Sequence, residues 1–212
     1  MERKSKMKKS YTDRLEIFDK LRGLGLDKKD LLHVVRAAMA ARADSVVSDP
    51  LNAKGQLMYI HGTRELRRIH LLKGWVIDRT DNIESILHPA TGIKVIYQNT
   101  DTAANPYRDP KAISKKGPAS VRMINQAQGV LFPEWISAEA IRLNAQVWYL
   151  CVAHKDDEVY AELSRPLSLE DDQFGEFAER IFIKQTGDEK PFNPEEFDFA
   201  DAKDFNVTVT RK

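Results

Sequence analysis

Two apolar runs joined by a short polar turn constrain the fold of this chain more than any other part of its sequence. Residues 147–152 read VWYLCV, residues 158–163 read EVYAEL, and the polar stretch HKDD lies between them at 154–157. Runs rich in β-branched and aromatic residues on either side of a polar turn are typical of an antiparallel hairpin. The chain is therefore predicted to contain a hairpin at the core of a β-sheet.

A second β-rich region lies in the middle of the chain. Segments 75–78, 83–87 and 93–98 are predicted strands, and the links between them contain DN at 81–82 and PATG at 89–92. Short links of turn-forming residues predict an antiparallel meander. In the last of these strands an apolar face alternates with a mixed one, which favours a sheet that helices cover on one side.

Helical periodicity dominates the first third of the chain. Apolar residues three and four positions apart predict helices within 10–23 and 27–47, which would form a helical hairpin. A third helix is predicted over 53–73, although a strand at 57–60 followed by a shorter helix is an alternative. The spacing of phenylalanine and isoleucine predicts a further helix over 173–183.

Together these patterns predict an α+β fold, in which an N-terminal helical hairpin and further helices pack on a mainly antiparallel sheet. Shorter helices are expected at 119–128 and 137–141, and a final strand at 205–210. We expect a disordered basic tail followed by a single domain. The predicted divisions are the tail at 1–9 and the domain at 10–212, with the hairpin at 10–47, a basic region at 53–122 and an acidic half at 123–212.

The composition excludes several classes of protein. A single cysteine, Cys151, excludes an internal disulfide framework and any metal site built from several thiolates. No apolar run approaches the ~20 residues that a membrane-spanning helix needs. The N-terminal residues MERKSKMKKS lack the apolar core of a secretory signal. We therefore expect a soluble, cytoplasmic protein with no membrane partner.

Charge is unevenly distributed along the chain, although the net charge is only +1. Residues 1–53 carry 12 basic and 8 acidic side chains, residues 54–122 carry 12 and 6, and residues 123–212 carry 9 and 18. A basic first part and an acidic second part favour binding to a polyanion or to a charged partner. The competing interpretation is that the two parts fold together and their charges mix on the surface.

The sequence contains no specific catalytic motif. The phosphate-binding loop, nucleophile-elbow and dinucleotide-binding patterns are all absent. Residues 61–63, HGT, have the H-x-T form of two-histidine phosphoesterases, but the second copy that this chemistry needs is missing. Asp78, Glu84 and Lys94 have the residue types of a metal-dependent nuclease, without its close acidic-x-Lys spacing. We therefore assign no catalytic residue, no metal ligand and no cofactor, and favour a non-enzymatic protein.

A long segment without periodicity, residues 99–118, holds three prolines and several basic side chains. Loops of this length without regular structure are usually functional or disordered. Together with the helix at 53–73, the segment would form a surface that follows a phosphate backbone, with Tyr107 stacking on a base. The candidate nucleic-acid-binding residues are Arg64, Arg67, Arg68, Tyr107, Arg108, Lys111, Lys115, Lys116 and Arg122. A solvated basic face without a ligand is the competing interpretation.

Three functional hypotheses follow from these patterns. The leading one is a non-enzymatic intracellular binding protein whose basic first half engages nucleic acid or a nucleoprotein complex. An alternative is a protein-interaction regulator or inhibitor, of the kind that phages and mobile elements encode, which docks through the acidic, phenylalanine-rich segment 184–204. A metal-dependent phosphodiesterase or nuclease at Asp78 is the third. The sequence leaves the partner's identity and homo-oligomerisation open.

Overall fold

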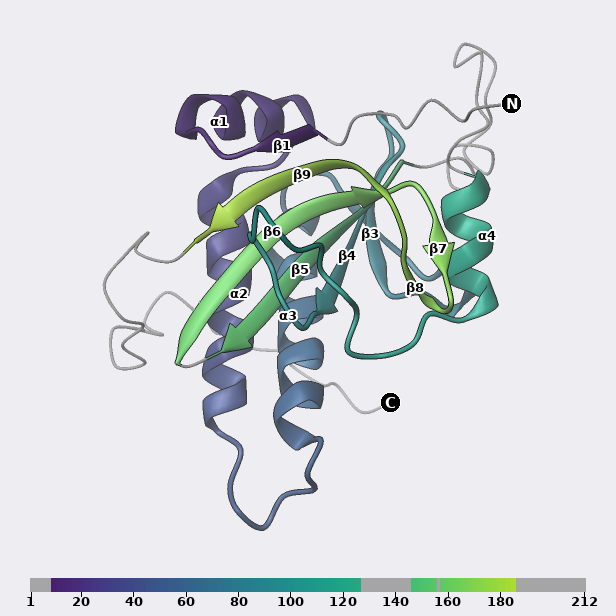
Figure 1. Ribbon diagram of the computed structural model, residues 1–212. Coiled ribbons are helices and arrows are strands. Elements are labelled where there is room, and N and C mark those ends of the chain that lie inside the picture. Colours follow the sequence, from purple (N-terminus) through teal and green to yellow (C-terminus); the bar gives the residue numbers. More distant parts are fainter. Residues whose placement is uncertain (1–8, 127–145, 156, 186–212) are drawn as a thin grey trace, which may run out of the picture.

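The computed structural model describes residues 9–126, 146–155 and 157–185 of the 212-residue chain. Helices pack on a seven-stranded mixed sheet, beside a small two-stranded sheet (Figure 1), so the predicted α+β class is confirmed. The helices are α1 (Arg14–Gly23), α2 (Lys28–Ala43), α3 (Ala53–Leu71) and α4 (Pro118–Gln126), with one 3-10 turn, η1 (Thr80–Asn82). The strands are β1 (Lys9–Tyr11), β2 (Val76–Asp78), β3 (Ser85–His88), β4 (Ile93–Asn99), β5 (Gln146–Lys155), β6 (Glu158–Pro166), β7 (Leu169–Glu170), β8 (Gln173–Phe174) and β9 (Phe177–Lys184).

The seven strands of the large sheet lie in the order β1-β9-β6-β5-β4-β3-β2. Both predicted antiparallel units are confirmed, since β2, β3 and β4 form the meander and β5 and β6 form the hairpin. Two pairs are parallel, β4 with β5 and β1 with β9. Parallel neighbours need a crossover connection. The described part of the connection between β4 and β5, residues 100–126, accordingly lies along one face of the sheet.

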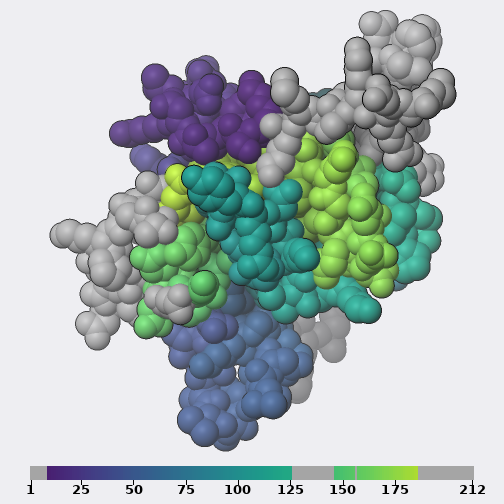
Figure 2. Space-filling view, in the orientation of Figure 1, coloured from purple at the N-terminus to yellow at the C-terminus, as the bar shows by residue number. Residues whose placement is uncertain are grey.

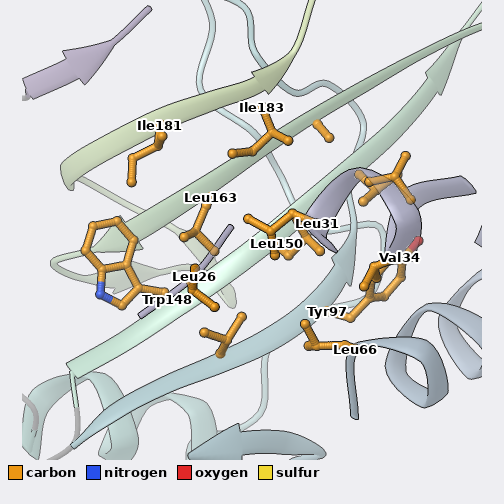
Figure 3. Close-up of a cluster of buried hydrophobic side chains, with 14 of the residues drawn as sticks. Leu26, Leu31, Val34, Leu66, Tyr97, Trp148, Leu150, Leu163, Ile181 and Ile183 are labelled. Carbon is orange, nitrogen blue, oxygen red and sulfur yellow. The ribbon is translucent and has the colours of Figure 1, made fainter. Parts of the chain in front are cut away.

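Helices α1, α2 and α3 cover the other face, which we call the helical face. Leu31 of α2 and Leu66 of α3 belong to one buried core with Trp148 and Leu150 of β5 (Figure 3). The side chains of Asp13 and Asp27 cap the N-termini of α1 and α2 by accepting hydrogen bonds from backbone N–H groups of the first turn. Both helices of the predicted 10–47 hairpin are present, but the long antiparallel packing joins α2 to α3, whereas α1 lies against β9.

Helix α3 approaches the sheet most closely at Gly62. A methyl group at this position would overlap the ring of Tyr97 in β4, so the missing side chain lets the helix and the sheet pack in direct contact. Tyr97 is fully buried, and burial raises the pKa of its hydroxyl group. The long helix predicted for 53–73 is thus confirmed and the alternative strand at 57–60 is wrong, because this segment buries a helically spaced face.

The opposite face of the sheet, which we call the loop face, is buried as well. Ile96, Tyr149 and Cys151 pack there against residues from segment 100–117, from α4 and from the β7-β8 sheet. Figure 2 shows segment 100–117, in teal, spread over the green strands. Helices α1 to α3 thus cover one face, as β4 predicts, but its mixed face is buried too, by segment 100–117, α4 and the β7-β8 sheet.

The helix predicted for residues 173–183 is also wrong, since this segment contains β8 and most of β9. Ile181 and Ile183 enter the core of the helical face, whereas Phe177 packs on the loop face. A strand that is buried on both faces gives a nearly continuous apolar run. Its spacing can then match a helix as well as a strand, which explains the error.

Several predictions concern parts of the chain outside the described residues. They are the basic tail up to residue 8, the helix at 137–141, the acidic segment from residue 186 onward and the strand at 205–210. Among the helices in the described ranges, none is both long and apolar enough to span a bilayer.

The contact at Gly62 predicts a large effect for a small substitution. Gly62→Ala should lower the free energy of unfolding by about 1–3 kcal/mol, because the added methyl group forces Tyr97 or the helix to shift. Gly55→Ala, in the same helix, is the matched control, because a methyl group added there meets no packed neighbour within 4 Å. This control should stabilise by about 0.5–1 kcal/mol through helix propensity. Urea unfolding of both variants measures the difference, and equal effects would contradict the proposed contact.

Candidate nucleic-acid interface

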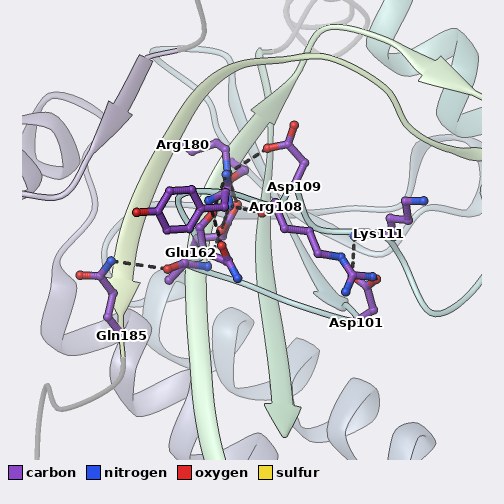
Figure 4. A network of polar contacts seen from close by, with 11 residues as sticks. Asp101, Arg108, Asp109, Lys111, Glu162, Arg180 and Gln185 are labelled. Atoms are coloured by element: carbon purple, nitrogen blue, oxygen red, sulfur yellow. Dashed lines mark hydrogen bonds and ion pairs between the residues drawn. The ribbon is translucent and has the colours of Figure 1, made fainter.

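One buried arginine, Arg180 in β9, holds the segment between β4 and α4 in place (Figure 4). Its guanidinium forms a two-point ion pair with Glu162 of β6, with Nε donating to Oε1 over 2.8 Å and Nη2 to Oε2 over 2.5 Å. Both side chains have 0% exposure. The guanidinium also donates to the carbonyl oxygens of Asn105 and Arg108 and to the carboxylate of Asp109. Arg180 thus links two strands to the loop that covers them.

Glu162 completes this network from the other side. Besides Arg180, its carboxylate accepts hydrogen bonds from the backbone N–H of Ala104 and from the hydroxyl of Ser164. Ala104 has a φ of 50°, in the left-handed region that a residue with a side chain rarely adopts. Such strain persists only where the surroundings determine the conformation. Segment 100–117 is therefore an ordered cover, fixed by a buried charge pair.

Four of the predicted nucleic-acid-binding residues lie on the exposed side of this cover. Tyr107 is 97% exposed, and Lys111 and Lys115 are exposed as well. Arg108 is exposed, but its Nη2 donates to the carboxylate of Asp101 over 2.6 Å. The free cationic groups on this side are thus fewer than the sequence indicates.

Lys116, by contrast, is buried beneath the cover, unlike its neighbour Lys115. Its Nζ donates to the side-chain oxygen of Gln98 and lies 4.9 Å from the ring centroid of Tyr149 and 5.2 Å from that of Phe174. Burial lowers the pKa of Lys116 to about 8. The lysine is consequently packed inside the loop face and has no direct access to a ligand in solution.

The arginines of α3 line a different surface, which we call the arginine groove. It is an open hollow of about 470 Å³ between α3 and the edge strand β2. The groove adds a fourth arginine, Arg79, which follows β2 directly and is not among the residues predicted from the sequence. Its lining residues are Tyr59, Ile60, Thr63, Arg64, Arg67, Arg68, Leu71, Ile77 and Arg79.

Glu84 organises the β2 side of the groove. Its carboxylate accepts hydrogen bonds from Nη2 of Arg67 and, over 3.3 Å, from Nε of Arg79. Burial tends to raise the pKa of Glu84, but the two arginines outweigh it and the pKa lies below its ordinary value. The Arg67 side chain is only 14% exposed, whereas that of Arg79 is 62% exposed. Arg67 therefore has mainly a structural role, and Arg79 presents its charge to solvent.

The other two arginines face solvent on the outer side of α3. Arg68 makes a two-point ion pair with Glu65 at 2.8 and 2.7 Å, and its side chain is still 62% exposed. Arg64 is exposed, and no ion pair joins it to another of the described residues. Four guanidinium groups thus stand against two carboxylates, so the groove keeps an excess of positive charge.

The predicted surface is therefore divided between two faces of the molecule. Arg64, Arg67 and Arg68 lie on α3, which covers the helical face, whereas Tyr107 and the loop lysines lie over the loop face. Arg122 of α4 is exposed and donates to Asp81 over 3.2 Å, in the β2-β3 connection that also carries Arg79. The tertiary structure brings Arg79 to the α3 arginines, and it separates these arginines from the loop lysines.

The set predicted for a metal-dependent nuclease is divided too. The Oδ2 of Asp78 lies 2.7 Å from the Nζ of Lys94, both groups are buried, and Asp78 also accepts hydrogen bonds from Thr80 and Ser85. Burial tends to raise the pKa of Asp78, but these donors outweigh it and the pKa is lowered. Glu84 faces the arginine groove instead. In the part of the chain that the structure describes, no three His, Cys, Asp or Glu side chains are placed to hold a metal ion.

No family model, curated protein or solved structure matches the chain. The function has to be inferred from the geometry and charge of these surfaces alone.

The network around Arg180 predicts a strong effect of neutralising its partner. Glu162→Gln keeps the shape but removes the charge, which should lower the free energy of unfolding by about 3–5 kcal/mol because Arg180 stays buried and charged. Trypsin should then cleave sooner after Arg108, since the loop loses its anchor. Glu176→Gln, at an exposed position before β9, is the control and should stay within about 0.5 kcal/mol. Unchanged stability and cleavage in Glu162→Gln would contradict this role.

The buried pair of Asp78 and Lys94 predicts a defined pH dependence. The pKa of Asp78 is lower in the folded chain than in the unfolded chain. The ionised carboxylate therefore stabilises the fold fully at pH values above the pKa of the unfolded chain, and this stabilisation is lost as the pH falls through the pKa of the folded chain. Asp78→Asn should therefore destabilise by about 3 kcal/mol near pH 7, and this difference should shrink from about pH 4 downward. Asp81→Asn, in an exposed ion pair, is the control and should cost under about 1 kcal/mol. Urea unfolding of the wild type and both variants between about pH 7 and pH 3 tests the prediction. A stability difference between the wild type and Asp78→Asn that does not change with pH would contradict it.

Proposed function

We propose that this protein binds nucleic acid through the arginine groove, as a non-enzymatic binding protein. The observation that carries the proposal is the gathering of Arg64, Arg67, Arg68 and Arg79 around one open hollow with only two carboxylates between them. Arginine guanidinium groups match phosphate oxygens in geometry as well as in charge. The groove is thus suited to a phosphate backbone.

The arrangement of the groove supports this proposal beyond its charge. Glu84 orients Arg67 and Arg79, and Glu65 orients Arg68, so these side chains lose little further freedom on binding. Arg64 has no such partner among the described residues and is available to a phosphate. Phosphate contacts position a nucleic acid without reading its sequence, so we expect binding with weak sequence preference and strong salt dependence.

The other hypotheses receive less support from the described residues. The acidic, phenylalanine-rich segment on which the protein-interaction hypothesis rests lies almost entirely outside them. Both carboxylate oxygens of Asp78 are engaged by neighbouring side chains, which leaves the phosphodiesterase hypothesis without an open ligand. Tyr107, Lys111 and Lys115 form a separate exposed surface.

The proposal predicts a specific effect of reversing the charge at Arg64. Arg64→Glu should weaken binding to a labelled oligonucleotide about tenfold at low salt, and should reduce the slope of log affinity against log salt by about one unit. Fluorescence anisotropy between about 50 and 200 mM salt measures both quantities. The fold should be unaffected, since Arg64 is exposed.

Two charge reversals elsewhere serve as matched controls. Lys54→Glu changes an exposed residue of the same helix outside the groove, and Lys115→Glu changes the loop surface. Both should reduce affinity less than Arg64→Glu does. Equal losses in all three variants would indicate a general charge effect, and a salt-independent affinity would contradict the proposal.

A further inference from the structure

The arginine groove contains apolar side chains that a phosphate backbone does not need. Tyr59, Ile60, Leu71 and Ile77 line it and are 39%, 47%, 42% and 37% exposed. In a duplex the faces of the bases are stacked inside, and only their edges in the grooves, the sugars and the phosphates are accessible. Unstacked bases, in contrast, bind to aromatic and apolar side chains that lie between basic groups. The lining of the groove therefore matches bases as well as phosphates.

Tyr59 is the side chain best placed to contact a base. It lies on α3 one turn before Thr63, another residue of the groove, and the charges of Arg67 and Glu84 both affect the pKa of its hydroxyl group. Burial and the charge of Glu84 raise the pKa of Tyr59, so the phenol stays neutral and no phenolate charge opposes a phosphate nearby. A partly exposed, neutral ring beside arginines is a suitable surface for stacking.

The basic surface continues from the groove around α3 to the side that faces α2. A second hollow, of about 520 Å³, lies there between α2 and α3 and is lined in part by Lys29, His33 and Arg36. Arg68 lines both hollows, so the two are adjacent and share a cationic group. We call the groove and this hollow together the basic track. Its carboxylates are Asp30, Glu65 and Glu84, of which Asp30 pairs with Lys73.

The course of the basic track favours a flexible ligand. A ligand that follows it must turn around α3, whose diameter with side chains is about 10–12 Å. Duplex DNA is stiff over about 50 nm and does not bend around so small a radius without a large cost. A single strand has no such stiffness, and its bases are free to leave the stack. Curvature and apolar lining thus point to the same kind of ligand.

We propose that the basic track binds single-stranded nucleic acid, with a base stacked on Tyr59 in the arginine groove and the backbone continuing past Arg68 to Lys29. This inference rests on the proposed function, because it names the form of nucleic acid that the groove takes. Ring stacking gives affinity for any base, so the expected binding is tolerant of sequence.

Anisotropy with the full-length protein tests the inference with three labelled probes: thymidine and uridine oligonucleotides of about 12 nucleotides, and a duplex of equal length. The single strands should bind about tenfold more tightly than the duplex at the same salt concentration. Tyr59→Ala should weaken single-strand binding about 5- to 150-fold, whereas Tyr59→Phe should retain it, because only the ring is needed. Lys29→Glu should weaken the same binding and reduce its salt slope by about one unit.

Each outcome decides between the two proposals. Equal affinity for duplex and single strands, or unchanged single-strand binding in Tyr59→Ala, overturns the single-strand inference. If Arg64→Glu still weakens binding in that case, the proposed function stands. No salt-dependent binding of any probe overturns both. Thermal unfolding of Tyr59→Ala and Tyr59→Phe verifies that they are folded, and a preference for uridine over thymidine distinguishes RNA from DNA.

Discussion

The ion pair of Arg180 and Glu162 is the interaction on which the loop face depends. Two charges without solvent contact are costly to bury, and they are tolerated here because almost every donor and acceptor around them has a partner. Those partners come from β6, from β9 and from the segment after β4. The pair therefore converts a stretch that has no regular structure into a fixed layer, which lets both faces of the sheet exclude water.

This burial also changes the meaning of the charge distribution along the chain. Lys116 and Lys94, which count as basic residues of the first half, are used inside the fold. Across the two halves, Arg180 reaches Asp109, and Lys20 of α1 pairs with Glu179 of β9. Charges that are segregated in sequence are thus partly mixed in space. What remains in excess on α3 is consequently a small, defined set of arginines rather than a whole basic half.

The position of the arginine groove follows from the topology of the sheet. The meander places β2 at the edge, and α3 packs against it through the core of the helical face. The side chains beyond that core, on α3 and after β2, then meet across an open hollow. Glu84 holds two of the arginines in place, because both donate to its Oε2. An edge strand, a helix and one carboxylate are sufficient to assemble the site.

The sequence by itself determined the elements with a clear local pattern: the hairpin of β5 and β6 and the meander. It placed the three arginines of α3 on a helix, but it left a strand at 57–60 open as an alternative, which only the structure excluded. It did not determine β9, because a strand buried on both faces loses its alternation and resembles a helix. It also did not show that Lys115 is exposed whereas Lys116 is buried, or that Arg79 lines the arginine groove. Both properties depend on which distant segment packs against a residue. The segment after β4 packs on the sheet and buries Lys116, and the approach of α3 to β2 brings Arg79 to the groove.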